Sequence, residues 1–304
     1  VMYKHYEVVG VFHGVFFAAF IQFLFIFIFV YLPSLNGRFS FGLIKKMLKF
    51  GIPFLPAGLL FLVTELSDRY FILWFLGEAQ VGIYSIAYKI GSIPLILISG
   101  INLAWQPYYI KHSDSSETRR LFGKIGTIIS FGFIFLLTIF SIGLPLIQSF
   151  GIVSVDYIGS LKIIPIIFCS YLFYTWYILL MPSIFLKDKQ NWAPIFRGSA
   201  AITNILLNIL LIPKYGILGA TIATLVSYFI MSSYLYLKNR EWMNIPINYK
   251  LIIPYFLLSI FLFIITLYTA ISMQLVITFL YLIFSIWILY TVISISEIKQ
   301  KLSL

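Results

Sequence analysis

Long apolar stretches alternate with short polar breaks along the whole chain. We count nine stretches, at roughly residues 8–32, 50–75, 81–107, 123–148, 161–186, 193–212, 216–237, 251–271 and 273–294. Most are long enough for a helix that crosses the bilayer core, which needs ~20 apolar residues. Only a helix or a closed barrel satisfies backbone N–H and C=O groups in hydrocarbon. The pattern predicts an all-α integral membrane protein, a polytopic bundle of about nine transmembrane helices.

Composition supports the membrane class and narrows the partners. The chain is 61% apolar and 10% charged, with a mean hydropathy of +1.01, whereas soluble domains carry about a quarter charged residues. A net charge of +11 would suggest nucleic acid for a soluble protein. Here the cations flank membrane spans, where they attract anionic lipid headgroups. We therefore expect the lipid bilayer as a partner, and no nucleic acid.

The cations fall mainly in every second break, which carries 15 of them against 3 in the other breaks. The larger set is Arg38, Lys45, Lys46, Lys49, Lys111, Arg119, Arg120, Lys124, Lys187, Lys189, Lys238, Arg240, Lys250, Lys299 and Lys301. Cationic loops stay preferentially in the cytoplasm. This assignment predicts a cytoplasmic C-terminus and, across nine spans, an external residue 1. An odd number of further spans upstream would restore a cytoplasmic start, and Val1 in place of Met agrees with a fragment.

Residues 40–50 place Leu43, Ile44, Met47 and Leu48 on one helical face and lysines on the other. Such a pattern is typical of a short helix lying in the membrane interface. A plain positive-inside linker explains it equally well. Aromatic residues at predicted span ends are interpreted as interfacial anchors, namely Trp105, Tyr108, Tyr109, Trp192 and Trp242.

The sequence contains no hydrolase elbow, phosphate-binding glycine loop, dinucleotide fingerprint or zinc-protease helix. Cys169 is the only cysteine, and the three histidines lack ligand spacing. We therefore predict that the protein is not an enzyme and has no catalytic residues, no cofactor and no cysteine- or histidine-bound metal.

Charged residues inside the predicted spans are the strongest candidates for function. The second span carries Glu65, Asp68 and Arg69, and the third carries Lys89. Such charges are costly in hydrocarbon and usually face a bundle interior or a watery cavity. One interpretation is a buried ion pair of Asp68 with Arg69 or Lys89, and the other is the wall of a polar transport cavity. Prolines should bend or break the same two spans, at Pro53 and Pro56 and at Pro94 and Pro107.

Two further groups of residues are interpreted mainly as helix-packing positions. Small residues recur at helical spacing in the seventh span, at Gly216, Gly219, Ala220 and Ala223, where they permit close approach of a neighbouring helix. Asn204 and Asn208 share one face of the sixth span, from which they can hydrogen-bond across the bundle. Arg197, near the start of that span, can extend to the headgroups.

Two blocks of sequence resemble a known family. The first contains Phe50-Gly51-Ile52-Pro53-Phe54-Leu55-Pro56, then Leu66-Ser67-Asp68-Arg69-Tyr70, Gly82-Ile83-Tyr84-Ser85 through Lys89-Ile90, and Ala104-Trp105-Gln106-Pro107. The second runs from Asn204 to Tyr228 and includes Ile212-Pro213-Lys214-Tyr215-Gly216. Together they resemble the bacterial polysaccharide-biosynthesis flippases (Wzx type) of the MOP exporter superfamily, which share a MATE-like fold.

That resemblance implies two six-helix lobes around a central cavity. Residues 1–49 would be the last span of the N-terminal lobe and an amphipathic linker, 50–237 the C-terminal lobe, and 238–304 an additional hairpin and cytoplasmic tail. Five N-terminal spans would then be missing, an odd number.

The implied function is the flipping of polyprenyl-diphosphate-linked oligosaccharides across the bacterial cytoplasmic membrane, for O-antigen or capsule synthesis. A polysaccharide polymerase and glycosyltransferases are candidate partners. In this interpretation Arg69 and Lys89 bind the diphosphate in the cavity, and Asp68 or Glu65 orients Arg69 or binds a coupling cation. The alternatives are a cation-coupled MATE-like drug or metabolite exporter and a non-transporting truncated membrane scaffold.

Overall fold

The computed structural model describes residues 7–34, 40–149, 161–266, 273, 276–288 and 290. In this part of the chain every regular element is a helix, which confirms the all-α class. Seven helices or helix pairs are long and apolar enough to cross a membrane. They are Val9–Tyr31, Phe41–Leu76, Glu78–Ile110, Ser116–Leu144, Ile164–Phe185, Gln190–Tyr215 and Ile217–Trp242. The prediction of a multi-pass membrane protein is thus confirmed.

The chain divides into two compact units, residues 1–50 and 51–304. In the first unit, α1 (Glu7–Ile26) continues through a π-helical stretch at Phe27–Tyr31 into α2 (Leu32–Ser34), and α3 (Phe41–Gly51) follows. None of the side chains described in this unit is buried. An all-round apolar helix of this kind is stable where lipid or protein covers it.

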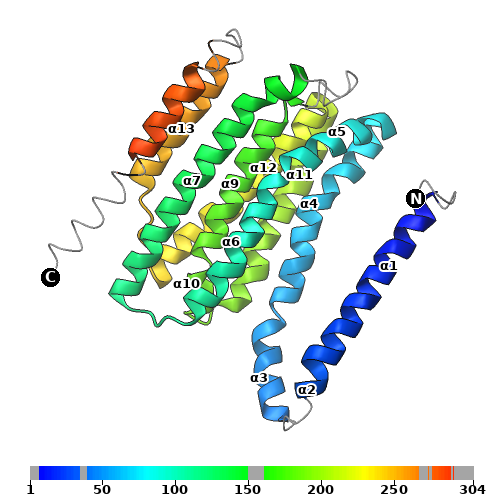
Figure 1. Cartoon of the computed structure of the whole chain (residues 1–304), viewed down its shortest axis with the longest axis vertical. Coiled ribbons are helices and arrows are strands. Elements are labelled where there is room, and N and C mark those ends of the chain that lie inside the picture. Colours follow the sequence, from blue (N-terminus) through cyan, green and yellow to red (C-terminus); the bar gives the residue numbers. More distant parts are fainter. Residues whose placement is uncertain are drawn as a thin grey trace. The chain divides into compact units, whose positions relative to one another are not determined.

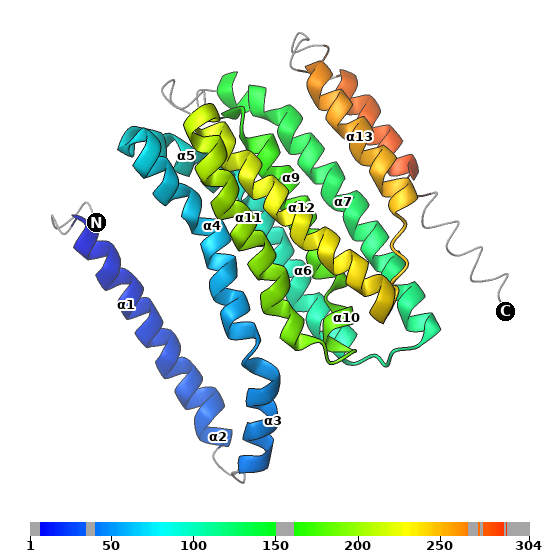
Figure 2. The same ribbon diagram turned by 180° about the vertical axis from the view of Figure 1, so that it is seen from behind.

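The second unit holds the remaining helices, whose order Figure 1 shows by colour. They are α4 (Phe54–Leu76), α5 (Glu78–Gly91), α6 (Ile93–Ile110), α7 (Ser116–Ser149), α9 (Ile164–Leu180), α10 (Pro182–Phe185), the 3₁₀ turn Gln190–Trp192, α11 (Ala193–Tyr215), α12 (Ile217–Trp242) and α13 (Tyr249–Thr266). The most extensive contacts join α11 to α12, α11 to α4 and α12 to α9. Helix α9 has the largest buried share of these spans, so the core of the unit lies around it, behind α11 and α12 in Figure 2.

Both spans are interrupted beside a proline, at two of the four prolines where a bend or break was expected. The first interruption lies at Ile52–Pro53, between α3 and α4, and the second lies at Ser92, where Pro94 opens α6. Helix α6 is not broken at Pro107, because it continues through this residue to Ile110. Proline lacks the N–H that an internal turn uses, and within a membrane bundle neighbouring groups can compensate for that loss.

Helices α11 and α12 form a tight antiparallel pair. Gly216 joins them with a φ of 60°, a left-handed conformation that glycine adopts without steric cost. A methyl group at Gly219 would collide with the carbonyl group of Leu211. This close approach places Asn204 and Asn208 of α11 opposite Thr224 of α12, where all three side chains are buried.

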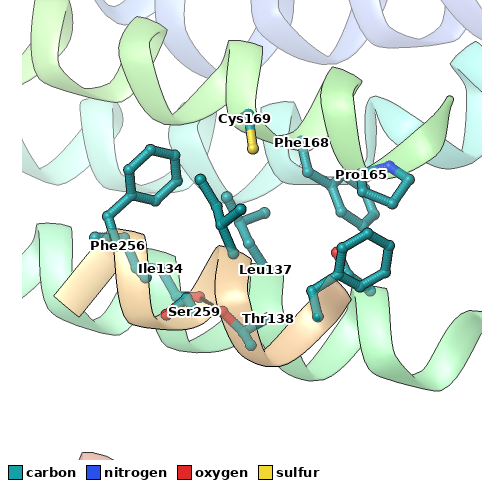
Figure 3. A pocket seen from close by; sticks show the side chains of 11 residues that line it. Ile134, Leu137, Thr138, Pro165, Phe168, Cys169, Phe256 and Ser259 are labelled. Atoms are coloured by element: carbon teal, nitrogen blue, oxygen red, sulfur yellow. Dashed lines mark hydrogen bonds between the residues drawn. The ribbon is translucent and has the colours of Figure 1, made fainter. Parts of the chain in front are cut away.

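The two C-terminal spans are shorter in the described residues than predicted, at Tyr249–Ile265 and Val276–Ile288. Buried hydroxyl groups tie them to α7: Tyr281 donates to Thr138 at 3.2 Å and to Tyr255 at 2.8 Å. A cavity of about 40 Å³ lies beside this network, between α7, α9 and α13 (Figure 3). Most of its lining is apolar, and Thr138 and Ser259 lie at its edge. The predicted separation of residues 238–304 from the lobe stays a prediction.

The predicted aromatic anchors divide into two kinds. Trp105 and Tyr109 are buried, with 4% and 0% of their surface exposed, so their interpretation as interfacial anchors is wrong. They pack instead against Phe122 and Phe185 respectively. Trp192 and Trp242 contact each other at a centroid distance of 5.5 Å, beside Lys238 and Lys189.

Candidate functional site

Two carboxylates of α4 point into the interior of the second unit. Glu65 and Asp68 are 8% and 0% exposed, and residues three apart share one helix face. That face packs on α11 and also contacts α12. Apolar residues toward the opposite face of α4, such as Leu59 and Leu66, are exposed. The carboxylates therefore lie where the helices meet.

Asp68 accepts three hydrogen bonds from three different helices. Its Oδ2 accepts from the hydroxyls of Tyr84 on α5 at 2.6 Å and Thr224 on α12 at 2.8 Å. Its Oδ1 accepts from the amide nitrogen of Asn208 on α11 at 2.7 Å. Asn204 extends the set, since its Oδ1 accepts from Asn208 at 2.9 Å and from Ser67 at 2.7 Å. We call Ser67, Asp68, Tyr84, Asn204, Asn208 and Thr224 the Asp68 cluster.

One atom of the Asp68 cluster is unsatisfied. Oδ1 of Asn208 is buried and makes no hydrogen bond in the described residues. A buried amide oxygen without a partner costs about 1–3 kcal/mol, so a hydrogen-bond donor or a cation beside it would be favourable. The amide nitrogen and oxygen exchange places when the side chain turns by 180°. Asn208 can therefore present either a donor or an oxygen ligand to the space beside Asp68.

Glu65 has a different environment, made by tyrosines alone. Its Oε2 accepts from Tyr88 on α5 at 3.1 Å and from Tyr171 on α9 at 2.9 Å, and its Oε1 accepts from Tyr228 on α12. Tyr171 and Tyr88 also contact each other through their hydroxyls at 3.3 Å. We call Glu65 with Tyr88, Tyr171 and Tyr228 the Glu65 cage. It joins four helices through one side chain.

The two predicted cavity cations lie on the periphery of these carboxylates. Arg69 is half-buried; it donates to the backbone carbonyl of Glu65 at 2.8 Å, and its guanidinium lies 4.7 Å from the ring centroid of Tyr88. Lys89 is exposed near the end of α5. Within the described residues neither cation forms an ion pair with Glu65 or Asp68. The ion pair considered from the sequence is therefore not observed there.

The electrostatic consequence is an unbalanced interior. Two acidic side chains lie one helical turn apart, and among the described residues every hydrogen-bond donor to their carboxylate oxygens is neutral. A buried carboxylate without a counter-charge is costly, and bound protons or cations remove that cost. The arrangement can thus hold a positively charged species at Asp68, where hydroxyl and amide oxygens surround the carboxylate.

A third carboxylate contrasts with these two because it lies outside the spans. Asp114, in the loop between α6 and α7, accepts from Arg119 at 2.6 and 2.9 Å and pairs with Lys187. The hydrogen bond from Arg119 holds the pKa of Asp114 below its ordinary value; partial burial opposes this shift, and Lys187 adds to it. This triad links two loops of the same unit.

The sequence located both carboxylates, both cations and the pair Asn204 and Asn208, but not the hydroxyl groups that bind the carboxylates. Tyr84 and Tyr88 are four residues apart on α5, and a polar pair at this spacing inside an apolar span was an available signal. Tyr171 and Tyr228 lie in helices rich in tyrosine, so spacing does not distinguish them.

Comparison with known proteins supports the resemblance. Residues 1–113 match the family model described as "Polysaccharide biosynthesis protein". This match includes Glu65, Asp68, Arg69 and Lys89, whereas the second sequence block, 204–228, lies outside it. The chain is also similar to the "Probable flippase AglR" of Haloferax volcanii, with 27% identity over 172 residues.

The similarity to this flippase covers only part of both chains. The aligned region is 51% of this chain and 33% of the archaeal protein, so the chain spans about a third of the length of this curated relative. No solved structure matches the chain. The comparisons thus confirm a distant similarity to flippases and to polysaccharide biosynthesis proteins.

Proposed function

We propose that the protein contributes to the flipping of polyprenyl-diphosphate-linked oligosaccharides across the bacterial cytoplasmic membrane. The observation that carries this proposal is a half-buried Arg69 with spare donors inside a span of a flippase-like chain. The chain's match to a polysaccharide biosynthesis family model and its similarity to a probable flippase support a lipid-linked glycan as the substrate. The glycan would cross in a polar cavity while the polyprenyl tail stays in lipid.

Arg69 and Lys89 are the proposed diphosphate ligands. A guanidinium offers five donors, and the described residues use only one hydrogen bond from Arg69. Lys89 follows Tyr88 on α5, and Arg69 lies on the ring of Tyr88. In a site of low dielectric constant, attraction between such cations and phosphate is stronger than in water.

Asp68 is the proposed site of the coupling cation. Oxygen ligands suit hard cations, and rotation of Asn208 would supply its unsatisfied oxygen beside the carboxylate. Glu65 would orient Arg69 indirectly, since Arg69 bonds to the Glu65 backbone and contacts Tyr88 of the Glu65 cage. Alternating exposure of the cavity would follow from rocking of the two predicted lobes.

The test uses cells in which this gene, in its natural reading frame, supplies the sole flippase. We expect Arg69→Ala with Lys89→Ala to abolish surface polysaccharide while membrane insertion stays normal. Arg120→Ala with Lys124→Ala removes two cations near the start of α7 and serves as the matched control, with output unchanged. Full polysaccharide output from the Arg69 and Lys89 double variant would refute the proposal.

A further inference from the structure

Arg197 lies among three aromatic rings that come from two other helices. Its guanidinium carbon is 4.7 Å from the ring centroid of Phe61 on α4, 5.7 Å from Tyr174 and 5.4 Å from Tyr177, both on α9. Rings within ~6 Å attract a cation through their negative faces. Neighbouring helices therefore hold this arginine inside the unit. We call these four residues the Arg197 cage.

The Arg197 cage leaves most of the arginine's donors unused. The structure gives it one hydrogen bond, from a terminal nitrogen to the Tyr174 hydroxyl at 3.3 Å. Among the described residues no carboxylate pairs with it. The ring faces attract the positive charge, while the tyrosine hydroxyls satisfy only part of the five N–H groups in the guanidinium plane. A ligand with several hydrogen-bond acceptors would satisfy the unused N–H groups of Arg197.

A second, independent group points to the same ligand. The hydroxyl of Tyr177 is fully buried and interacts with Arg197, but its own O–H donates no hydrogen bond of regular geometry in the described part of the chain. A buried hydroxyl rarely stays unpaired. With Arg197 it forms a pair of adjacent donors, and a phosphate group, which has several charged oxygens and no obligatory donor, complements such a pair.

We propose that the Arg197 cage is a binding site for a phosphate group carried on a membrane lipid, separate from the one at Arg69 and Lys89. Phe61, which contacts Arg197, precedes Arg69 by eight residues on α4, about 12 Å along a helix. A diphosphate is too short to reach both arginines at once. Arg197 and Arg69 therefore bind the phosphate at two different places along the bundle.

The depth of the Arg197 cage in the bundle limits which phosphate groups can reach it. Arg197 is the fifth residue of α11, which follows the short loop that carries Lys187 and Lys189. It thus lies nearer the cation-rich end of the bundle than Arg69 does. Two sources of phosphate reach this depth, the headgroup of bulk anionic phospholipid and the diphosphate of a polyprenyl carrier. The second source rests on the proposed function.

The test measures lipid binding to the 304-residue chain in phosphatidylcholine nanodiscs by native mass spectrometry. The probes are undecaprenyl diphosphate and, as the uncharged control, undecaprenol. We expect Arg197→Gln to weaken diphosphate binding about tenfold or more, the scale of a lost charged hydrogen bond, without affecting undecaprenol. Arg120→Gln makes the same charge change on an exposed residue and should leave binding unchanged.

Tyr177→Phe keeps the ring and removes only the unpaired hydroxyl, so it should weaken diphosphate binding about fivefold even where Arg197→Gln fails to fold. Competition by phosphatidylglycerol at equal concentration would assign the site to bulk headgroups, and its absence would assign it to the polyprenyl carrier. Unchanged binding of both phospholipid and diphosphate in both variants would overturn the proposal. Arg69→Gln separates the two sites, because it tests the proposed function without touching the Arg197 cage.

Discussion

The carboxylates of the Asp68 cluster and the Glu65 cage lie three residues apart on one helix, yet different groups hydrogen-bond to them. Glu65 meets three phenol hydroxyls from three helices, all of which act as donors to it. Asp68 meets a phenol, a hydroxyl and an amide, next to an amide oxygen that has no partner. The first arrangement joins four helices around one carboxylate. The second can turn its amide and accept a cation.

The largest expected effect tests the second half of this comparison. Asp68→Asn keeps the size of the side chain and removes the charge that attracts a coupling cation. Loss of one member of a buried charge pair costs about 2–5 kcal/mol, so we expect transport to fall about 30-fold or more. The measurement is polysaccharide output under an imposed ion gradient. Unchanged transport with unchanged dependence on the gradient would exclude a coupling role.

Glu65→Gln is the matched change in the Glu65 cage. Three hydrogen bonds would lose a charged acceptor, and one phenol would face an amide N–H₂ group. Because hydrogen bonds to charged groups are the stronger ones, we expect the free energy of unfolding to fall by about 1–3 kcal/mol, as measured by denaturation in detergent. The dependence on the ion gradient should remain. A loss of that dependence in Glu65→Gln alone would reverse the assignment of the two carboxylates.

Tyr228→Phe removes a single donor from the Glu65 cage and keeps the ring. Hydrogen bonds between membrane helices contribute about 0.6 kcal/mol on average and rarely more than about 1.7. We therefore expect a loss of stability near 1 kcal/mol in the same denaturation assay. Thr224→Val serves as the counterpart in the Asp68 cluster. It should alter ion dependence more than stability, and the opposite ranking would contradict the comparison.

Asp114 provides a partly solvated carboxylate for comparison with Glu65 and Asp68. We expect its substitution to have the smallest effect on stability. Its pKa is lowered in the folded protein, so its contribution to stability is present above the ordinary carboxyl pKa of about 3.9. That contribution is lost as the pH falls below this value through the folded pKa. Asp114→Asn should cost about 0.5–1 kcal/mol at neutral pH, as is typical of partly solvated ion pairs. The difference in stability between the parent and the variant should shrink as the pH falls below about 4, and a constant difference would show that charge is not the cause.

The long, all-round apolar stretches predict the helices because the bilayer imposes a length and an internally bonded backbone on any span. Pro53 and Pro94 predict helix breaks for an equally local reason. Pro107 does not break its helix, since the effect of a proline depends on the neighbours that compensate for its missing donor. Trp105 and Tyr109 illustrate the same limit, because a place near a span end does not reveal which face is covered.

The sequence by itself determined the membrane class, the polar positions in the spans and the similarity to flippases, all of which depend on residue types and local spacing. Only the tertiary structure decided that Asp68 meets Asn208, that Glu65 meets three tyrosines, and that neither carboxylate pairs with Arg69 or Lys89 in the described residues. These contacts join residues separated by up to 163 positions. Helix rotation and packing set such contacts, and a single apolar sequence restrains both only weakly, because lipid and protein surfaces accept the same side chains.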